Sequence, residues 1–444
     1  MKLKLAYYAD DFTGGTDSMQ MLANAGYKTM LFLEPPTAEW LETHYPELEC
    51  IGVAGISRSM NTCQMNRELR PSLHKLASLD ADLLHYKICS TCDSSETIGN
   101  VGKVMEWLRP LYPDQPFIPF LAASPELGRY TVFGHHFAAW NDIIYRLDRH
   151  PVMAKHPVTP MGESDLRLHF AQQTRLRCGQ LNILDIERHD DLTEVCTQLA
   201  KDVDFVILDA VNQEHMTRIG RLLRTMSARA PLCTVGSSGI QTAWALGSPS
   251  HQVHNSAVTI PSRPTLVLSG SCSPTTRQQM DAAEQHGFRI VRLEVHQWLE
   301  HPLIEEQQTN DLISLLQEGH SAVAYTASGP DDEAIPQLRD KLAQHGLKAA
   351  DSGEFIGRRL GSIAKRAVKE AGIRRLVLAG GDSSGFASRE LGVTGLQMLW
   401  SVSPGAPLCH CYSEDPEIDG LELALKGGQL GHVHYFESIR SGTW

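Results

Sequence analysis

Short apolar runs alternate with longer amphipathic patterns along the first half of the chain. The apolar runs cover residues 4–9, 28–33, 51–56, 82–88, 117–122, 204–208 and 232–235. Between several of them lie helix-length patterns, in which apolar residues recur every three or four positions, at 101–111, 192–199 and 216–226. Strands that alternate with helices are typical of a largely parallel sheet with helices on its faces. The pattern therefore predicts an α/β fold.

A second α/β region follows a stretch that lacks periodicity. Residues 246–264 are rich in Gly, Ser and Pro, but strand-like runs resume at 265–268, 289–295, 322–326 and 376–379. At about 150 residues per domain, a chain of 444 residues suits two or three domains. We expect two domains, each with a mainly parallel sheet flanked by helices. They would span residues 1–250 and 265–444, with a linker at 251–264.

Charge and composition narrow the classes of partner. The formal net charge is −12 and the chain has no basic tract, so neither nucleic acid nor an anionic membrane is expected as a partner. No apolar run is long enough for a signal peptide or a membrane span, which favours a cytoplasmic protein. The ten cysteines are irregularly spaced, as expected of reduced thiols. A small anionic substrate would need a local cluster of Arg and Lys.

The first strand-like run ends in two adjacent aspartates. Asp10 and Asp11 are followed by Phe-Thr-Gly-Gly and a predicted helix at 16–26. Such aspartates commonly cap turns and helices, but ligands also bind open α/β sheets at the carboxyl ends of the strands. If the strand conformation persists, the two side chains point to opposite faces and only one readily faces a cleft. We favour Asp11 as the residue that meets a reacting hydroxyl, and Asp10 as the capping residue.

Two cations follow later strand-like runs. Arg58 comes after the run at 51–56, and Lys87 lies in the run at 82–88, just ahead of Cys-Ser-Thr-Cys-Asp-Ser-Ser95. Arg can grip a carboxylate through two parallel hydrogen bonds, and Lys adds a point charge. Each residue alone could equally be a surface ion-pair partner. Together they predict a site for the carboxylate of an acidic small molecule.

Glycine-rich turns follow strand-like runs in the second half. They are Ser269-Gly-Ser-Cys-Ser273, Gly380-Gly-Asp-Ser-Ser-Gly385 and Lys426-Gly-Gly428. Glycine lets the backbone approach a bound group closely, and the free amides at the start of a following helix favour phosphate. Each turn could also be an ordinary tight turn. Ser273 as a cap and Pro274 at the first helical position predict a helix start beside the first turn.

Four motifs, in this order, resemble the four-carbon acid sugar kinases over nearly the whole chain. Ala9-Asp-Asp-Phe-Thr-Gly-Gly-Thr-Asp17 is similar to the family's Ala-Asp-Asp-Leu-Thr-Gly-Ala signature. Ser269-Gly-Ser-Cys-Ser273, with the Thr-Arg-Gln-Gln that follows, matches the opening of its second domain. The loop at 380–385 is similar to its Gly-Gly-Glu-Thr-Ser-Gly, and Lys426-Gly-Gly428 falls where the family has Lys-Ser-Gly.

The resemblance implies a kinase with an amino-terminal domain for a sugar acid and a carboxyl-terminal domain for ATP. Phosphate would pass to the terminal hydroxyl of a four-carbon acid of the threonate, erythronate or 3-oxo-tetronate type. Mg²⁺ would accompany ATP, through ligands that the resemblance leaves open. The resemblance is also compatible with a homodimer. The residues implied for the sugar acid and the chemistry are Asp10, Asp11, Arg58, Lys87, Ser90 and Thr91. Those implied for ATP are Ser271, Gly380, Gly381, Asp382, Ser383, Ser384, Gly427 and Gly428.

Departures from the family pattern leave other functions open. Many members read Lys-x-Asp-Ser-Thr-Leu-Arg-Gly where this chain has Lys87-Ile-Cys-Ser-Thr-Cys-Asp, without the Arg-Gly pair. A kinase of a branched or oxidised acid, such as 3-oxo-isoapionate, is therefore one alternative. A nicotinamide-dependent dehydrogenase is another, although no Gly-x-Gly-x-x-Gly follows the first strand. A non-catalytic sugar-acid sensor is a third, which the paired aspartates disfavour.

Overall fold

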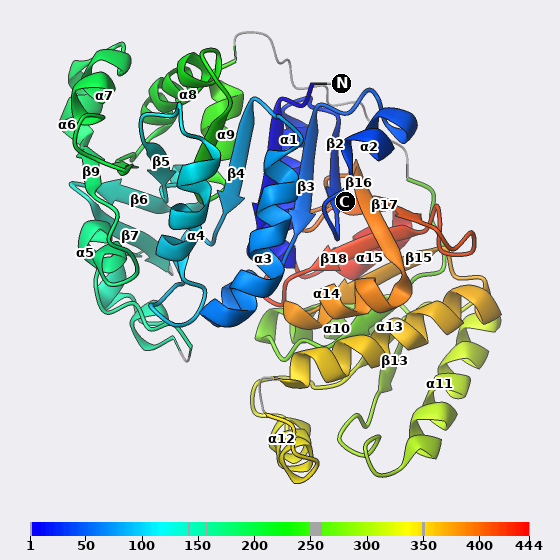
Figure 1. Ribbon diagram of the computed structural model, residues 1–444. Helices are drawn as coiled ribbons and strands as arrows, with labels where there is room; N and C mark the ends of the chain where they lie inside the picture. The colour runs from blue at the N-terminus through cyan, green and yellow to red at the C-terminus, as the bar shows by residue number, and fades with distance from the viewer. Residues whose placement is uncertain (1, 141–142, 157, 249–259, 349–350, 444) are drawn as a thin grey trace. The chain divides into compact units, whose positions relative to one another are not determined.

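The computed structural model describes residues 2–140, 143–156, 158–248, 260–348 and 351–443. The chain divides into two compact units (Figure 1): unit 1 contains Met1–Thr29 and Glu34–Asn255, and unit 2 contains Met30–Leu33 and Ser256–Trp444. The linker expected at 251–264 lies, from 251 to 259, outside the described residues. Within the described ranges, no helix combines the length and apolar character needed to cross a membrane.

Unit 1 is built on a parallel sheet, as the alternating pattern predicts. The strand order is β3–β1–β4–β11–β5–β10–β9, and every pair in it is parallel. The strands are β1 (Leu5–Ala9), β3 (Cys50–Ala54), β4 (Leu83–Lys87), β5 (Ile118–Leu121), β9 (Cys178–Leu181), β10 (Phe205–Leu208) and β11 (Leu232–Gly236). All but β9 are buried along their whole length, as expected of a parallel sheet covered on both faces.

Helices of unit 1 follow most of these strands. They are α1 (Phe12–Asn24), α2 (Ala38–His44), α3 (Thr62–Ala77), α4 (Val101–Leu108), α5 (Leu166–Ala171), α6 (Ile183–Arg188), α7 (Thr193–Leu199), α8 (Gln213–Ser227) and α9 (Gly239–Leu246). Helix α1 begins four residues earlier than the sequence pattern indicates, because Asp11 caps it and accepts a hydrogen bond from the Gly14 amide at 2.9 Å. The glycines expected in a loop therefore lie in the first turn of a helix.

A small antiparallel sheet in unit 1 has no counterpart in the predicted pattern. Its strands are β6 (Arg129–Val132), β7 (His135–Trp140) and β8 (Ile143–Arg146), in the order β6–β7–β8. The hairpin between β6 and β7 turns at Phe133 and Gly134, both of which have positive φ. In β7, buried residues alternate with more exposed ones, so one face of the strand packs inward.

The strands of unit 2 lie side by side in the order β13–β14–β12–β15–β18–β17–β16–β2. The first five strands pair in parallel, and β17, β16 and β2 continue the sheet with antiparallel pairs. Its strands are β2 (Thr29–Phe32), β12 (Leu266–Ser269), β13 (Arg289–Arg292), β14 (Ala322–Tyr325), β15 (Arg375–Ala379), β16 (Val393–Trp400), β17 (Leu408–Ser413) and β18 (Glu422–Lys426). Strand β2, from the amino-terminal part of the chain, thus pairs with β16 of unit 2.

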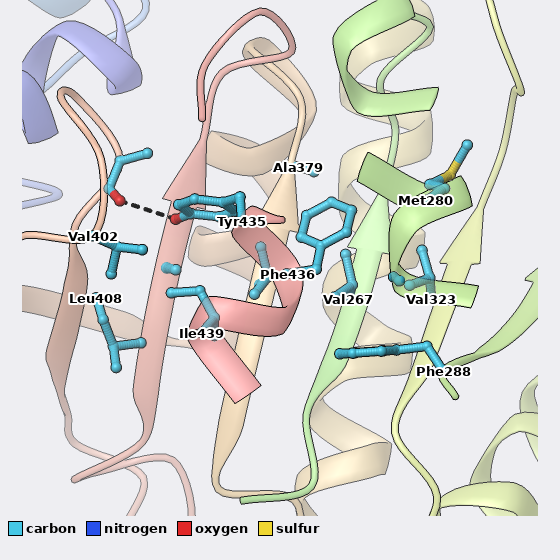
Figure 2. Close-up of a cluster of buried hydrophobic side chains, with 14 of the residues drawn as sticks. Val267, Met280, Phe288, Val323, Ala379, Val402, Leu408, Tyr435, Phe436 and Ile439 are labelled. Atoms are coloured by element: carbon cyan, nitrogen blue, oxygen red, sulfur yellow. Dashed lines mark hydrogen bonds between the residues drawn. The ribbon is translucent and has the colours of Figure 1, made fainter. Parts of the chain in front are cut away.

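Helices follow most of the strands of unit 2 along the chain. They are α10 (Pro274–Gln285), α11 (Pro302–Gln317), α12 (Ala334–Gln344), α13 (Ser352–Ala371), α14 (Asp382–Leu391) and α15 (Tyr435–Ser441). Figure 2 shows the core on one face of the sheet, where Val267 and Val323 meet Phe436 of α15 and Met280 of α10. The Tyr435 hydroxyl donates to the Ala406 carbonyl at 3.0 Å, which ties α15 to the turn before β17. Helix α13 packs against both α11 and α14 (Figure 1).

Candidate functional site

The carboxyl ends of neighbouring strands in unit 1 stand in one row. Ala9 at the end of β1 lies beside Ala54 of β3 and Lys87 of β4, and Lys87 lies beside Gly236 of β11. The loops that follow these four strands therefore leave the sheet at the same edge. This is the place where open α/β sheets bind their ligands.

Asp10 and Asp11 meet at one guanidinium at this edge. Arg58 donates from Nε and Nη2 to the two carboxylate oxygens of Asp10, at 3.1 and 2.8 Å. Its Nη1 lies 3.0 Å from Asp11 Oδ2. The expectation that the two aspartates point opposite ways was wrong, because β1 ends at Ala9 and strand alternation does not extend to them. The capping assignment was also wrong, since Asp11 and not Asp10 caps α1.

The environment shifts the pKa values of the two carboxyl groups in opposite directions. Burial raises the pKa of Asp10 above its ordinary value, although Arg58 opposes the rise. Burial acts the same way on Asp11, but there Arg58, Lys87 and hydrogen bonds from Thr13 and Gly14 outweigh it and lower the pKa. Asp11 is thus held as a carboxylate, and it is the more exposed of the two, with 19% of its side chain accessible against 4% for Asp10.

Lys87 supplies a second cation beside the start of α1. Its side chain is buried, and a Cβ atom added to Gly14 would collide with both its Nζ and Asp11 Oδ1, so the three groups crowd together. In the described part of the chain, Lys87 makes no ion pair within contact distance, whereas Arg58 directs three of its five N–H groups to aspartates. Lys87 is therefore the cation with more capacity left for a ligand.

Asp17 faces the same cluster, and our sequence reading did not select it. Burial raises the pKa of Asp17, while Lys87 and a hydrogen bond from Ser238 lower it and Asp11 raises it. Asp17 lies in the first acidic motif, and Ser238 lies in the loop after β11. The motif itself contained the signal, but only the sheet register brings Ser238 to it.

The loop after β4 holds the predicted Ser90 and Thr91. The Thr91 hydroxyl donates to Asp93 at 2.6 Å and lies 3.0 Å from the Cys89 sulfur. His136 Nε2 lies 2.6 Å from the Ser90 carbonyl oxygen and must donate to it. Burial lowers the pKa of His136 to about 4, so the ring is neutral and its Nδ1 accepts from the Thr131 hydroxyl. His136 of β7 thus holds the loop after β4 in place, a contact that no local pattern could reveal.

Three glycine turns of unit 2 also leave their sheet in register. Ser269 of β12 lies beside Ala379 of β15, which lies beside Lys426 of β18. The Gly270 amide donates to the Ala379 carbonyl at 2.9 Å, and the Gly380 amide donates to the Lys426 carbonyl at 2.8 Å. The structure therefore brings together the predicted turns at 269–273, 380–385 and 426–428.

Close approach explains the glycines at two of these positions. Gly380 has φ +147°, and a Cβ atom there would collide with the Ser383 hydroxyl. A Cβ atom on Gly428 would lie 2.7 Å from Ser271 Oγ. Ser271 and Ser383 are buried, and the Ser384 hydroxyl donates to the Gly381 carbonyl at 2.8 Å at the start of α14. The side chain of Asp382, also predicted for ATP, lies outside the described part of the structure.

A cavity of about 260 Å³ adjoins the first two turns. Its wall includes Gly270, Gly381 and Ser383 from those turns, together with apolar residues from the starts of α12 and α13. Arg339 adds a cation to the wall. An apolar recess beside amide-rich turns at helix starts has the chemistry to hold a flat heteroaromatic group with phosphates attached.

Models of known protein domains match most of both units. A model of a sugar-binding N-terminal domain matches residues 5–244, and a model of a nucleotide-binding C-terminal domain matches residues 266–436. The chain is 37% identical to a 3-oxo-isoapionate kinase of Paraburkholderia graminis, over 99% of this chain and 94% of the relative. It is 28% identical to a 3-oxo-tetronate kinase of Salmonella typhimurium, over 98% of each chain.

Solved structures share the fold. A protein of Salmonella typhimurium LT2, described as a candidate tRNA synthase, matches with a TM-score of 0.80 and 26% identity over the full length of both chains. Haemophilus influenzae protein HI1011 matches with a TM-score of 0.75 and 23% identity over 98% of both. The domain matches and the relative that is 37% identical confirm the resemblance seen in the four motifs. The chain belongs to the four-carbon acid sugar kinase family, in which a sugar-binding N-terminal domain precedes a nucleotide-binding C-terminal domain.

Proposed function

We propose that the protein is an ATP-dependent kinase that phosphorylates the terminal hydroxyl of a four-carbon sugar acid of the 3-oxo-tetronate type. One observation carries the proposal. Each unit gathers its candidate residues at the carboxyl edge of its own sheet, with charged side chains in the unit matched as sugar-binding and glycine turns in the unit matched as nucleotide-binding. Phosphoryl transfer needs mainly positioning and charge stabilisation, which these two sets of groups supply.

The sugar acid is recognised by the cations of unit 1. We assign its carboxylate to Lys87, which has no carboxylate partner at contact distance in the described chain, and to the N–H groups of Arg58 that do not bind Asp10 or Asp11. Ser90 and Thr91, in the loop that β7 steadies, hydrogen-bond the hydroxyls of the acid. This assignment keeps the expectation from the sequence that Arg58 and Lys87 together bind the carboxylate, and it gives Lys87 the larger share.

Asp11 is the residue we assign to the reacting hydroxyl. Its pKa is lowered, so it is ionised at neutral pH, and its position at the start of α1 is fixed by the Gly14 amide and the Thr13 hydroxyl. A fixed carboxylate can orient the alcohol and accept its proton as the phosphoryl group arrives. Asp10, which is more deeply buried and doubly hydrogen-bonded to Arg58, serves to hold that guanidinium in place.

ATP binds at the glycine turns of unit 2. The apolar cavity takes the nucleoside, and the turns at 269–273, 380–384 and 427–428 take the phosphates. The described residues contain no group of three His, Cys, Asp or Glu side chains that could cage a metal. Mg²⁺ would not need such a cage, because it keeps several waters and binds through phosphates with one or two carboxylates. When bound, Mg²⁺ would neutralise charge on the transferred phosphate.

A branched 3-oxo acid is the second candidate substrate. Identity to the 3-oxo-isoapionate kinase, 37%, exceeds the 28% identity to the 3-oxo-tetronate kinase of Salmonella typhimurium over comparable lengths. The loop after Lys87 also lacks the Arg-Gly pair found in many members, which changes the lining of the sugar site. Both candidate substrates are 3-oxo acids with a terminal hydroxyl.

A coupled assay of ADP release tests the proposal. Purified protein is given ATP, Mg²⁺ and, one at a time, 3-oxo-tetronate, 3-oxo-isoapionate, D- and L-threonate and erythronate. We expect kcat/KM for one of the 3-oxo acids to exceed the value for every acid without the oxo group. ATP turnover that no acid in the panel accelerates would contradict the proposal, and a preference for 3-oxo-isoapionate would select the second candidate.

A further inference from the structure

Lys426 is a buried cation without a described acidic partner. It ends β18, and its side chain has no exposed surface. Its Nζ donates to the Gly427 carbonyl at 2.9 Å, to the Gly428 carbonyl at 3.2 Å and to the Thr276 hydroxyl at 3.2 Å. These three bonds use all its donors, but they do not cancel its charge. A buried charge without a counter-charge is costly unless an anion comes to it.

The same contacts fix the direction of two amides. The peptide bonds here are trans, so each amide N–H points opposite to the carbonyl of its own peptide group. Because the Gly427 and Gly428 carbonyls point toward Lys426, the amides of Gly428 and Gln429 point away from it. Neither amide donates to a protein acceptor within the described ranges. Two successive free amides form a small anion-binding concavity.

Among the described residues, no charged side chain adds to the effect of burial on the pKa of Lys426. From α10 it meets the Thr276 hydroxyl, which itself donates to the Gly428 carbonyl at 2.9 Å. Arg277 on the same helix pairs with Asp281 at 2.9 Å. Burial lowers the pKa of Lys426 to about 7. His432, the next titratable residue along the chain, does not contribute to this shift. A nearby anion would raise that pKa.

We propose that Lys426 is a positioning residue for the nucleotide phosphates: it anchors the two glycine carbonyls so that the amides of Gly428 and Gln429 face the phosphates, and its charge attracts them. The inference rests on the proposed function, because it takes the anion to be a nucleotide. The glycine turn at 427–428 alone would leave these amides free to rotate. The hydrogen bonds from Lys426 to the two glycine carbonyls fix the direction of these amides.

Calorimetric titration with ADP at pH 8, in two buffers of different ionisation enthalpy, tests this role. At pH 8 roughly nine-tenths of a group with pKa near 7 is neutral, so its protonation on binding takes up nearly one proton per nucleotide. ADP itself is fully deprotonated at this pH. We expect wild-type protein to take up a proton. Lys426→Met should lose this uptake and bind ADP about tenfold to a hundredfold more weakly, because it removes both the positive charge and the hydrogen bonds that orient the two amides.

Lys365→Met is the matched control. Lys365 lies on α13 in the same unit, with 40% of its side chain exposed, and contacts Asp415 at 3.8 Å. It should keep wild-type affinity and proton uptake. Equal ADP affinity and uptake in wild type and Lys426→Met would overturn the inference while leaving the nucleotide site intact. A wild-type protein that binds no nucleotide would overturn the proposed function as well. If Lys426→Met does not fold, the uptake measured on wild type decides: an uptake near zero contradicts the role.

Discussion

Both candidate sites lie at the carboxyl ends of parallel strands, but they consist of different chemical groups. In unit 1, Asp10, Asp11, Arg58 and Lys87 crowd the carboxyl ends of β1 and β4 with side-chain charge. In unit 2, the carboxyl ends of β12, β15 and β18 present glycine backbone and hydroxyls, with Lys426 buried beneath. The parallel sheet fixes where each site is, and the residue types decide what it can hold.

The difference follows from the proposed ligands. A small acid offers few atoms, so recognising it requires directed charges close to each one. A nucleotide brings several phosphate oxygens and a large ring, which backbone amides and an apolar recess can hold without many charged side chains. Substitutions should therefore act through charge in unit 1 and through backbone geometry in unit 2.

Asp11→Asn should give the largest effect. Replacing the carboxylate that meets the reacting hydroxyl should lower kcat by about 10²- to 10⁴-fold, the usual contribution of a general base. ADP affinity should stay unchanged, because the glycine turns belong to unit 2. Steady-state kinetics and ADP calorimetry measure the two quantities. A folded variant with near-normal kcat would remove Asp11 from the chemistry and turn attention to Asp17.

Arg58→Met should strongly destabilise unit 1. The substitution leaves Asp10 and Asp11 close together without their shared cation, a change that typically costs about 3–5 kcal/mol. Arg358→Met is the control, because Arg358 is 60% exposed and pairs with Glu354 across one turn of α13 at 2.7 Å. Such surface pairs contribute about 0.5 kcal/mol. Urea unfolding of both variants measures the difference. Equal losses would show that the buried cluster has no special role in stability.

Gly380→Ala should weaken nucleotide binding without changing charge. The residue has φ +147° and an added Cβ atom would strike the Ser383 hydroxyl, so strain of about 1–3 kcal/mol is expected, or roughly five- to a hundredfold in ADP affinity. Gly162→Ala is the control, because Gly162 lies outside the three glycine turns and nothing lies within 4 Å of its added Cβ atom. Calorimetry with ADP compares them. Equal affinities would mean that the backbone of this turn does not contact the nucleotide.

Asp332→Asn should give the smallest effect, and one that depends on pH. Burial would raise the pKa of Asp332, but Arg292 and the Ser328 and Ala334 amides outweigh it and hold the pKa far below the ordinary value. The carboxylate therefore stabilises the fold above about pH 4, and this contribution is lost as the pH falls further. We expect Asn to cost about 1 kcal/mol at pH 7. The gap in unfolding free energy should narrow below pH 4; a constant gap would contradict the ionised pair.

Local sequence patterns predicted the features that arise within a few residues. The strand, glycine turn and capped helix at Ser269–Pro274 are encoded in neighbouring residues, and the structure has Ser273 as the cap of α10. The two mainly parallel sheets likewise follow from alternating patterns. The three glycine turns could therefore be found from sequence alone.

Features that depend on distant contacts were missed or misassigned. The arrangement of Asp10 and Asp11 depends on Arg58, which lies 48 residues from Asp10. The role of His136 depends on a hairpin that reaches back 46 residues to Ser90. Lys426 belongs to the Lys426-Gly-Gly428 motif, but the motif does not show that its charge is buried. This became apparent only from its contact with Thr276, 150 residues away. Pairings of this kind are set by sheet topology, which residue periodicity does not specify.

Following the γ-phosphate itself shows whether the protein transfers it to a sugar acid. Wild-type protein is incubated with Mg²⁺, ATP labelled in its γ-phosphate and either 3-oxo-tetronate or 3-oxo-isoapionate, and the products are separated and counted. We predict that label appears on the terminal hydroxyl of one acid, one phosphate for each ADP formed, and that Asp11→Asn lowers both rates together. Label released only as inorganic phosphate, with neither acid phosphorylated, would contradict the account of this protein as a sugar-acid kinase.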